Sequence, residues 1–268
     1  MRSRDPVEGV QLLQAWFSGR GYETHRHDTY AIGITDVGVQ AFDYRGVAEI
    51  SLPGQVVVLH PDEAHDGRAG TTAGFGYRIV YVAPAHIAEA ARAIRGRPTA
   101  LPFVPQPVGA NPALGQAVES AFQHLHELLA ADGLILRLTE ALLEADRSAA
   151  AGSTELSLDL AAIERARDYL DAERERVVQS AELEAVSGLT RYDLARQFRA
   201  AIGTSPYRYS LMRRLDRARA QLRQAHSLAD LALGAGFADQ AHFSRMFKAA
   251  FGISPARYRR LVAIREPG

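Results

Sequence analysis

Three histidines in the N-terminal part have side chains that can bind a ligand or a metal ion. His25 and His27 stand two residues apart, and His65 follows the turn signal Pro61-Asp62. On one strand, His25 and His27 point to the same face, and His65 on a second strand completes a three-ligand set suited to Fe, Mn or Zn. Three interpretations stay open: a metal site, a metal-free pocket in which the histidines form hydrogen bonds, and histidines with a structural role only.

We expect the metal-free pocket, in which Arg68 and Tyr77 add charge and aromatic surface. The predicted effector-binding residues are therefore His25, His27, His65, Arg68 and Tyr77, with no metal, no cofactor and no catalytic residue. The absence of cysteine excludes disulfides and thiolate sites and favours a reducing compartment, the cytoplasm. The sequence contains no nucleophile elbow, Walker loop or dinucleotide fingerprint.

A repeat in the C-terminal third suggests a second kind of chemistry. The segment 198–209 matches the segment 247–258 at an offset of 49 residues, and the apolar residues of both copies recur at i, i+4 and i+7 and face a local core. Arg and Gln form bidentate pairs with guanine and adenine edges, whereas Lys, Ser and further Arg suit phosphates. The opposite faces present such side chains: Arg191, Tyr192, Arg196 and Arg199 in one copy, and Gln240, Ser244, Arg245 and Lys248 in the other.

The charge distribution favours a polyanionic partner for this segment. The whole chain is neutral, with 31 basic and 31 acidic residues. Residues 188–265 contain 15 basic and 4 acidic residues, a net charge of +11, so the remainder carries −11. This asymmetry indicates that the C-terminal third binds a polyanion, the plainer alternative being a solvated arginine-rich face.

Each copy of the repeat has the signals of a helix-turn-helix motif. In the first copy, Ser180 caps a short helix, Gly188 supplies the turn, and Thr190 caps a second helix that Gly203 ends. The corresponding residues of the second copy are Ser227, Gly234, Gly236, Asp239 and Gly252. The sequence therefore predicts two helix-turn-helix motifs.

One long helix from Pro206 to about Ala225 is predicted to link the two motifs, because apolar residues keep helical spacing there without a breaker. About 20 helical residues span roughly 30 Å. Successive major grooves on one face of DNA lie about 34 Å apart. We therefore expect one chain to fill two adjacent grooves.

Short runs of strand composition between turn signals predict a β-rich part up to about residue 105. The clearest predicted strands are Tyr30–Thr35, Val37–Phe42, Gln55–Leu59 and Tyr77–Val82. Their spacing favours a small antiparallel barrel or sandwich. The proline-rich segment 98–112 is expected to end the β region.

Two apolar helices are predicted over residues 113–147, with Asp132-Gly133 as the break between them. Such helices need a partner surface, either the barrel wall or the same helices of a second chain. We expect a homodimer. Residues 148–154 have the small, polar composition of a flexible tether, and we expect a linker over 148–157.

Residues 236–258, GFADQAHFSRMFKAAFGISPARY, form the most specific motif in the chain. Together with Arg214, Leu215 and Ala218, they resemble the AraC/XylS family of transcription regulators. The resemblance implies base contacts from the second helix of each motif: Tyr192, Ala195 and Arg196, then Gln240, Ala241, Ser244 and Arg245. Glu184 departs from the small residue usual in the family, which puts the packing of the first motif in doubt.

The segments HRHD at 25–28, LPG at 52–54 and LHPDEAH at 59–65 resemble the cupin-type effector domain of these regulators. In cupin enzymes, such histidines bind a metal together with a carboxylate. Here the residues after His27 read DTYAIG and lack that glutamate, and Glu63 lies on a turn.

The expected fold is α+β with two domains, a small cupin-like β-barrel with a helical hairpin and an all-α double helix-turn-helix domain. The expected boundaries are 1–110 for effector sensing, 111–147 for the dimerisation hairpin, 148–157 for the linker and 158–268 for DNA binding. No run approaches the ~18 apolar residues that span a bilayer and no export signal is present, so we expect no membrane association.

The predicted function is sequence-specific DNA binding by a transcription regulator that responds to a small-molecule effector. The expected partners are double-stranded DNA, the effector, a second copy of the chain and, if the regulator activates, the transcription machinery. Two alternatives stay open: a metal-dependent cupin enzyme fused to a DNA-binding module, and an effector-free constitutive regulator.

Overall fold

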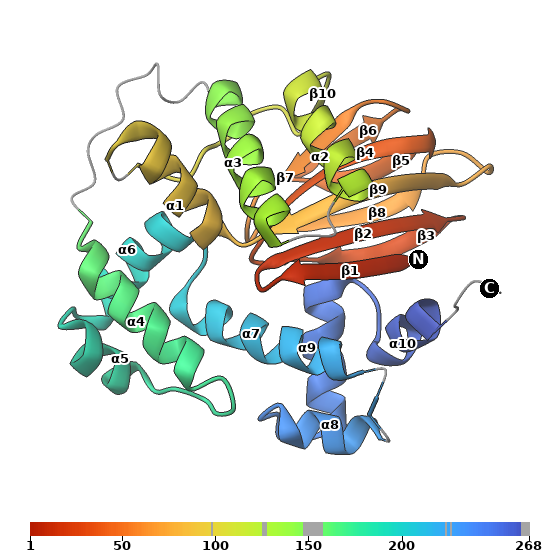
Figure 1. The fold of residues 1–268 in the computed structure, drawn as a ribbon. Coiled ribbons are helices and arrows are strands. Elements are labelled where there is room, and N and C mark those ends of the chain that lie inside the picture. The colour runs from red at the N-terminus through yellow and green to blue at the C-terminus, as the bar shows by residue number, and fades with distance from the viewer. Residues whose placement is uncertain (98, 125–127, 147–157, 223, 226, 264–268) are drawn as a thin grey trace. The chain divides into compact units, whose positions relative to one another are not determined.

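The computed structural model of the chain describes residues 1–97, 99–124, 128–146, 158–222, 224–225 and 227–263. It divides into two compact units, one of residues 1–24 and 29–155, the other of residues 156–268 with the short segment 25–28. Strands dominate the first unit and helices make up the second (Figure 1). The predicted linker 148–157 lies outside the described residues, and the predicted domain boundaries stay predictions.

The strands of the first unit form two antiparallel sheets. The six-stranded sheet has the order β1-β2-β9-β4-β7-β10, and the four-stranded sheet has the order β3-β8-β5-β6. The strands described are β1 (Arg2–Val7), β2 (Val10–Phe17), β3 (Arg20–His25), β4 (Tyr30–Gly38), β5 (Gln40–Tyr44), β6 (Val47–Ser51), β7 (Val56–Leu59), β8 (His65–Ala69), β9 (Phe75–Val82) and β10 (Val108–Gly109). The predicted antiparallel β domain is confirmed, as two sheets rather than a closed barrel.

Strand alternation gives the six-stranded sheet two different buried faces. Phe17 and Tyr77 on one face contact Tyr22 of the four-stranded sheet, with ring centroids of Phe17 and Tyr22 5.0 Å apart. Residues of the other face, among them Leu12 and Ile32, form the main apolar core with three helices. This sheet is therefore buried on both sides.

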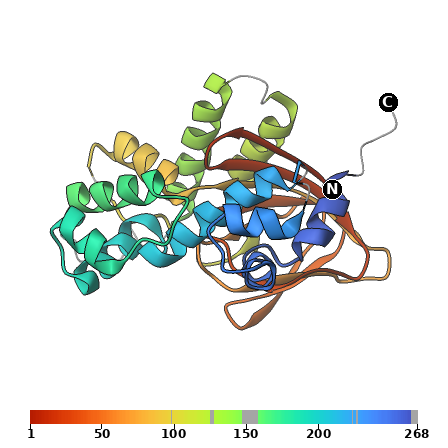
Figure 2. The same ribbon diagram turned by 90° about the horizontal axis from the view of Figure 1, so that it is seen from below.

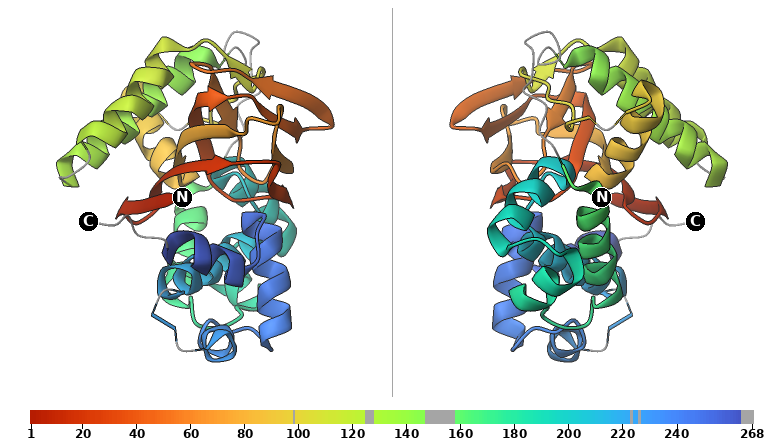
Figure 3. Two further views of the ribbon diagram at one scale, coloured as in Figure 1. Left: turned by 90° about the vertical axis from the view of Figure 1, so that its right-hand side faces the viewer. Right: turned by 90° about the vertical axis from the view of Figure 1, so that its left-hand side faces the viewer.

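The three covering helices are α1 (Pro84–Arg95), α2 (Pro112–His124) and α3 (Leu128–Ala145). Helices α2 and α3 run side by side, and Figure 2 and the two views of Figure 3 show the pair from other directions. Their apolar stripes, including Leu114, Val118, Leu134 and Leu138, are buried against the sheet of the same chain. The six-stranded sheet of the same chain is thus one partner surface of the predicted hairpin.

Several local predictions for this unit were wrong. Asp132-Gly133 does not break the hairpin, since α3 runs through both residues. A glycine inside a helix costs about 1 kcal/mol. The burial of Leu134 and Leu138, which follow Gly133 in the same helix, outweighs this cost. The predicted strand Val37–Phe42 is divided between β4 and β5, and the helix α1 and the short strand β10 were not expected.

The second unit consists of helices with two apolar cores. Its described helices are α4 (Leu160–Ala172), α5 (Ser180–Ser187), α6 (Arg191–Ile202), α7 (Pro206–Gln221), α8 (Leu228–Gly234), α9 (Gln240–Phe251) and α10 (Pro255–Ala263). The first core joins α4, α5, α6 and the start of α7. The second core joins the rest of α7 with α8 and α9. The two predicted helix-turn-helix motifs are α5-α6 and α8-α9, and α7 links them.

Side-chain caps start the helices where the sequence predicts them. Thr190, Ser227 and Asp239 each accept a hydrogen bond from a backbone N–H in the first turn of the helix that follows. Gly188 and Gly252 adopt φ of 77° and 71°, the left-handed conformation that ends α5 and α9 without strain. Ser180 was not a cap: it is the first residue of α5, and Gln179 forms a capping box with Glu182.

Among the described residues, none of the helices has both the length and the apolar composition needed to cross a lipid bilayer.

Two leucines of α8 allow a matched test of the second core. Leu231 is 6% exposed within this core, whereas Leu233 is 62% exposed on the same helix. Leu231→Ala is expected to lower the free energy of unfolding by about 2–5 kcal/mol, because it leaves a cavity. Leu233→Ala is expected to change it by less than about 1 kcal/mol. Denaturant unfolding measures both, and equal effects would contradict the described packing of α8.

Candidate DNA-binding surface and histidine cluster

Helix α6 has one buried and one exposed face. Leu194 and Phe198 are buried in the first core. The predicted DNA-binding residues lie on the exposed side: Arg191, Tyr192, Arg196 and Arg199 are exposed, and Ala195 is half-buried. Tyr192 is 80% exposed, which is unusual for an aromatic side chain in a structured helix.

Helix α9 repeats this arrangement. Phe243 and Phe247 are fully buried, with ring centroids 5.5 Å apart, and anchor the helix in the second core. The predicted DNA-binding residues again lie on the other side: Gln240, Ala241, Arg245 and Lys248 are exposed and Ser244 is half-buried. The two helices therefore present matching polar faces, as the offset of 49 residues predicts.

Part of the positive charge of this unit is structural. The Arg214 guanidinium donates to the carbonyl of Gly236 at 2.9 Å and lies 4.9 Å from the Phe237 ring centroid. Arg219 pairs with Asp216 at 3.2 Å. These arginines of α7 stabilise the helix packing, so a net charge of +11 overstates the number of side chains that present charge to a polyanion.

Glu184, the departure from the family pattern, connects the two helices of the first motif. Its Oε1 accepts a hydrogen bond from the backbone N–H of Arg191 at 2.8 Å, and the Arg191 Nε lies 3.5 Å away. A carboxylate at a helix N-terminus is stabilised by the unpaired N–H groups and the helix dipole. Glu184 therefore satisfies the start of α6, and the first core closes around Leu183 and Leu194.

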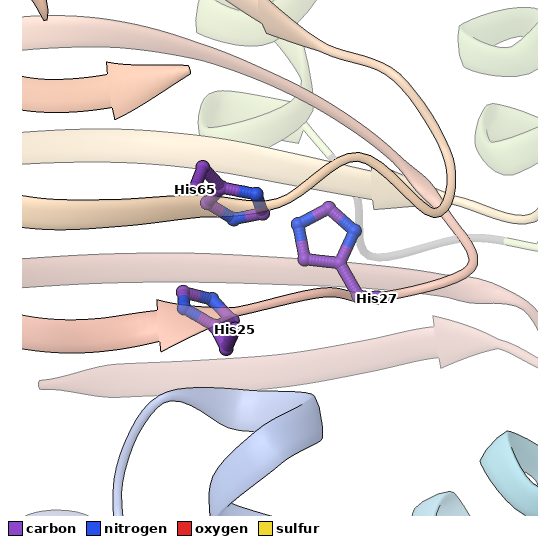
Figure 4. A group of neighbouring side chains, drawn as sticks. All are labelled: His25, His27 and His65. Atoms are coloured by element: carbon purple, nitrogen blue, oxygen red, sulfur yellow. The ribbon is translucent and has the colours of Figure 1, made fainter. Parts of the chain in front are cut away.

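The three histidines singled out in the sequence lie together (Figure 4). Each offers a ring nitrogen, and these nitrogens all lie within 4.8 Å of one another. His25, His27 and His65 are 7%, 5% and 5% exposed. His25 ends β3 and His65 begins β8, its neighbour in the four-stranded sheet, whereas His27 lies beyond the end of β3. The expectation that His25 and His27 share a strand was therefore wrong, although they do converge.

His65 has a defined proton arrangement. Its Nδ1 lies 2.9 Å from the carbonyl oxygen of Glu63. A carbonyl can only accept, so Nδ1 carries the hydrogen and the lone pair is on Nε2. Burial lowers the pKa of His65 to about 4, which keeps the ring neutral near pH 7.

The other two predicted effector-binding residues have partners elsewhere. Arg68 lies three positions after His65 on β8, so alternation places it on the opposite face, where it pairs with Asp66 at 3.0 Å and Asp43 at 3.2 Å. Tyr77 is buried and donates to the hydroxyl of Tyr22 at 2.8 Å. Burial raises the pKa of Tyr77 well above its usual value. Their role in effector binding stays a prediction.

Helices α6 and α9 and the histidine cluster lie in segments of the chain that match two known protein families. Residues 9–146 match the AraC-like ligand binding domain, and residues 183–261 match a helix-turn-helix domain. The chain belongs to the AraC family. It is thus an AraC-type transcription regulator with a DNA-binding helix-turn-helix domain and a ligand-binding domain.

Two relatives illustrate the similarity of this AraC-family chain. It is 25% identical over 233 residues to an uncharacterized HTH-type transcriptional regulator, YbfI, of Bacillus subtilis, covering 82% of this chain and 81% of the relative. Its fold is similar to that of unsaturated fatty acid-bound ToxT from Vibrio cholerae, with a TM-score of 0.67 and 13% identity over 98% of this chain and 100% of ToxT. ToxT bound to (E)-4-(8-methylnaphthalen-1-yl)but-3-enoic acid gives a TM-score of 0.64 at 13% identity, over 95% and 100% of the two chains.

A fourth histidine in the AraC-like ligand-binding domain was missed as a separate feature. The His60 Nδ1 lies 2.8 Å from the Tyr44 hydroxyl, and the backbone N–H of Val104 donates to Nε2 at 3.0 Å. Because Nε2 accepts, Nδ1 carries the hydrogen and the ring is neutral. Its position directly after the apolar run Val56–Leu59 was the available sign that it is buried.

A cavity of about 290 Å³ lies beside this network in the ligand-binding domain. Its wall comes from β7, the segment 104–111, α2 and α3, and combines apolar and polar surface. Val104, which donates to His60, belongs to this wall, and Gln106, Asn111 and Glu144 supply polar groups. The cavity was not predicted from the sequence, in which residues 98–112 were interpreted only as a connector.

The neutral state of His60 predicts a pH dependence of stability. Burial lowers its pKa to about 4, and the Arg45 charge acts in the same direction while Asp146 opposes it. Between pH 6.5 and 4 the unfolded chain therefore binds a proton that the folded chain does not, so stability falls as the pH falls. The full difference is about 3 kcal/mol.

The measurement is the free energy of unfolding from pH 7 to pH 4 for the wild type and for His60→Gln. We expect a shallower pH dependence for the variant, with His65 contributing equally to both. Parallel curves would show that His60 is not held neutral.

Proposed function

We propose that this AraC-family protein reads DNA with both α6 and α9 and regulates transcription when a small molecule binds its N-terminal unit. The observation that carries the proposal is the pair of matching exposed faces. Each exposed face is basic or polar, and the opposite face of the same helix carries buried phenylalanine. Both helices begin after a residue whose side chain caps the first turn. Such a helix is the element that helix-turn-helix proteins place in the major groove.

The exposed side chains divide into two proposed roles. Arg196, Gln240 and Arg245 have the forked or amide ends that pair with base edges. Arg199 and Lys248, one turn further on, suit phosphate oxygens and give salt-dependent affinity without sequence preference. Helix α7 holds both motifs on one chain and, at 16 residues, is about 24 Å long.

For the sensing role, we propose that the histidine cluster, with Arg68 and Tyr77, contributes to effector binding. The cluster is buried within the part of the chain that matches the AraC-like ligand binding domain. ToxT binds an unsaturated fatty acid. At 13% identity, this supports a small-molecule effector in general rather than a fatty acid. We assign no catalytic step to these residues.

The DNA-binding proposal predicts different effects for two neighbouring residues of α9. Arg245→Ala is expected to relax specificity at one position of the site and to cost about 1–3 kcal/mol of binding free energy. Lys248→Ala is expected to weaken binding to all sequences alike and to reduce the salt slope by about 1. Binding isotherms on a selected site and on random DNA, at several salt concentrations, measure both.

The matched control for these variants is Glu89→Ala, which removes an exposed charge on α1 in the other unit. It is expected to leave both quantities unchanged. If Arg245→Ala and Lys248→Ala affect specific and random DNA equally, the assignment of base and phosphate contacts fails.

We also propose that the full chain is a homodimer that uses the helices α2 and α3. Leu136 of α3 is 42% exposed, although the leucines on its other face pack on the sheet. Sedimentation should show a dimer, and Leu136→Glu should shift it to the monomer because an unpaired charge would be buried. Leu233→Glu on α8 is the control. A wild-type monomer, or a Leu136→Glu variant that sediments as the wild type does, would contradict this interface.

A further inference from the structure

The cavity of about 290 Å³ lies on the helix-covered side of the six-stranded sheet. Its floor includes Val56, Val58 and Leu114, which are buried in the main apolar core with residues of α2 and α3. The four-stranded sheet, which carries His65, packs against the other face of the six-stranded sheet. The cavity is therefore a site separate from the histidine cluster.

Gly109 keeps the cavity open. It pairs with Val56 across β10 and β7, and residues directly opposite each other on antiparallel strands point to the same face. A side chain at position 109 would therefore project toward the space that Val56 lines. Among the described residues, no atom lies within 4 Å of the position that a Cβ would take there, and the φ of Gly109 is not in the left-handed region. The backbone would accept a larger residue, and glycine leaves this part of the wall unfilled.

The rim of the cavity is exposed and its floor is buried. Gln106, Ala110 and Glu144 of the lining are exposed, which makes the cavity reachable from solvent. Sites for small molecules combine apolar surface with a few polar groups and have volumes of roughly 300–1,000 Å³. A volume at the low end of this range suits a small ligand.

The charge of the wall selects a cation. Among the described residues that line the cavity, Glu144 is the one charged side chain, and none is Lys, Arg or His. Glu144 stands in the last turn of α3, where the helix dipole is negative and no basic side chain of the same turn offsets it. An anion would meet Glu144 without a compensating charge, whereas a cation pairs with it.

The backbone N–H groups of the wall are largely absent or already bonded. Pro105 and Pro107 have no N–H, and the N–H of Val104 donates to His60. At the start of α2, the side chain and the carbonyl of Asn111 accept two N–H groups of the first turn, at 3.0 Å and 2.9 Å. A ligand that donates hydrogen bonds, such as an ammonium group, is therefore better matched to this wall than one that only accepts them.

We propose that this cavity binds a small organic cation, an amine or ammonium compound with a short apolar body. The apolar body lies on Val56 and Val58 in the space beside Gly109, and the ammonium group faces Glu144. The proposal goes beyond the function proposed above, because it names a second ligand site and the charge of its ligand. Binding of the cation does not depend on DNA binding.

The test titrates the full chain at pH 7 with butylamine, cyclohexylamine and benzylamine. Each amine is compared with the carboxylate of the same skeleton: pentanoate, cyclohexanecarboxylate and phenylacetate. We expect calorimetry to show saturable binding of one amine per chain, about 10-fold or more tighter than its carboxylate. The bound amine should also raise the melting temperature, because a ligand of the folded state stabilises it.

Two variants locate the binding. Gly109→Leu is expected to weaken amine binding by more than about 10-fold, because leucine fills the space beside Val56. Glu144→Gln is expected to weaken it by about five-fold, since an exposed ion pair contributes little. The matched control is Glu89→Gln, which removes an exposed charge on α1 outside the cavity wall and should bind the amine as the wild type does.

Three outcomes overturn the proposal: no saturable amine binding by the wild type, equal affinity for amine and carboxylate, and equal affinity of the wild type and Gly109→Leu. If Gly109→Leu does not fold, Ala110→Trp gives the same comparison, because Ala110 lies at the exposed rim.

DNA binding measured on the same preparations keeps this proposal apart from the proposed function. Wild type that binds a selected DNA site but no amine overturns the cavity site and leaves the regulator function intact. Saturable amine binding without DNA binding supports the cavity site and removes the proposed function.

Discussion

Helix α7 takes part in both cores of the helix-turn-helix unit, and the proposed reading of DNA by α6 and α9 depends on this shared helix. Tyr209 near its start is buried in the first core, and Met212 and Leu215 are buried in the second. A single rigid helix that is packed at both ends sets the distance and rotation between the two motifs. The recognition faces of α6 and α9 then need no further contact with each other to be held in register.

Within each motif, buried side chains and capped helix ends fix the orientation of the exposed face. Two buried rings, Phe243 and Phe247 in α9, place the opposite face of the helix toward solvent. Capped N-termini and left-handed glycines fix the helix ends, so a helix of only twelve residues keeps its orientation. Structural arginines such as Arg214 join the core, whereas the arginines of α6 and α9 that we propose as DNA contacts are exposed.

The helical unit was predictable from its sequence because its signals are local. A capping residue, a positive-φ glycine and an i, i+4 apolar pair act within a few residues. The β unit was less predictable, since its six-stranded sheet is buried on both faces and strands such as β2 lack clean alternation. Gly133 shows the same limit, because tertiary burial of α3 overrides a local helix breaker.

Some residues of the candidate sites could be predicted from the sequence and others could not. The convergence of His25, His27 and His65 was predictable from the histidine spacing, although His27 lies outside the strand. Arg68 was predicted to join the effector site, but it lies three positions after His65, so the alternation of side chains along β8 places it on the opposite face of the sheet. A single sequence does not show contacts between segments that are far apart, such as the bonds of His60 to Tyr44 and Val104. It also does not show a contact across a turn, such as the cap that Glu184 provides for α6.

If one chain reads two adjacent major grooves through α6 and α9, selection of bound DNA from a random pool by the full chain should reveal both contacts. We expect a site with two base-specific blocks whose centres lie about 10 base pairs apart, the spacing of one helical turn. A site with a single block for each bound chain, or no sequence enrichment, would contradict it.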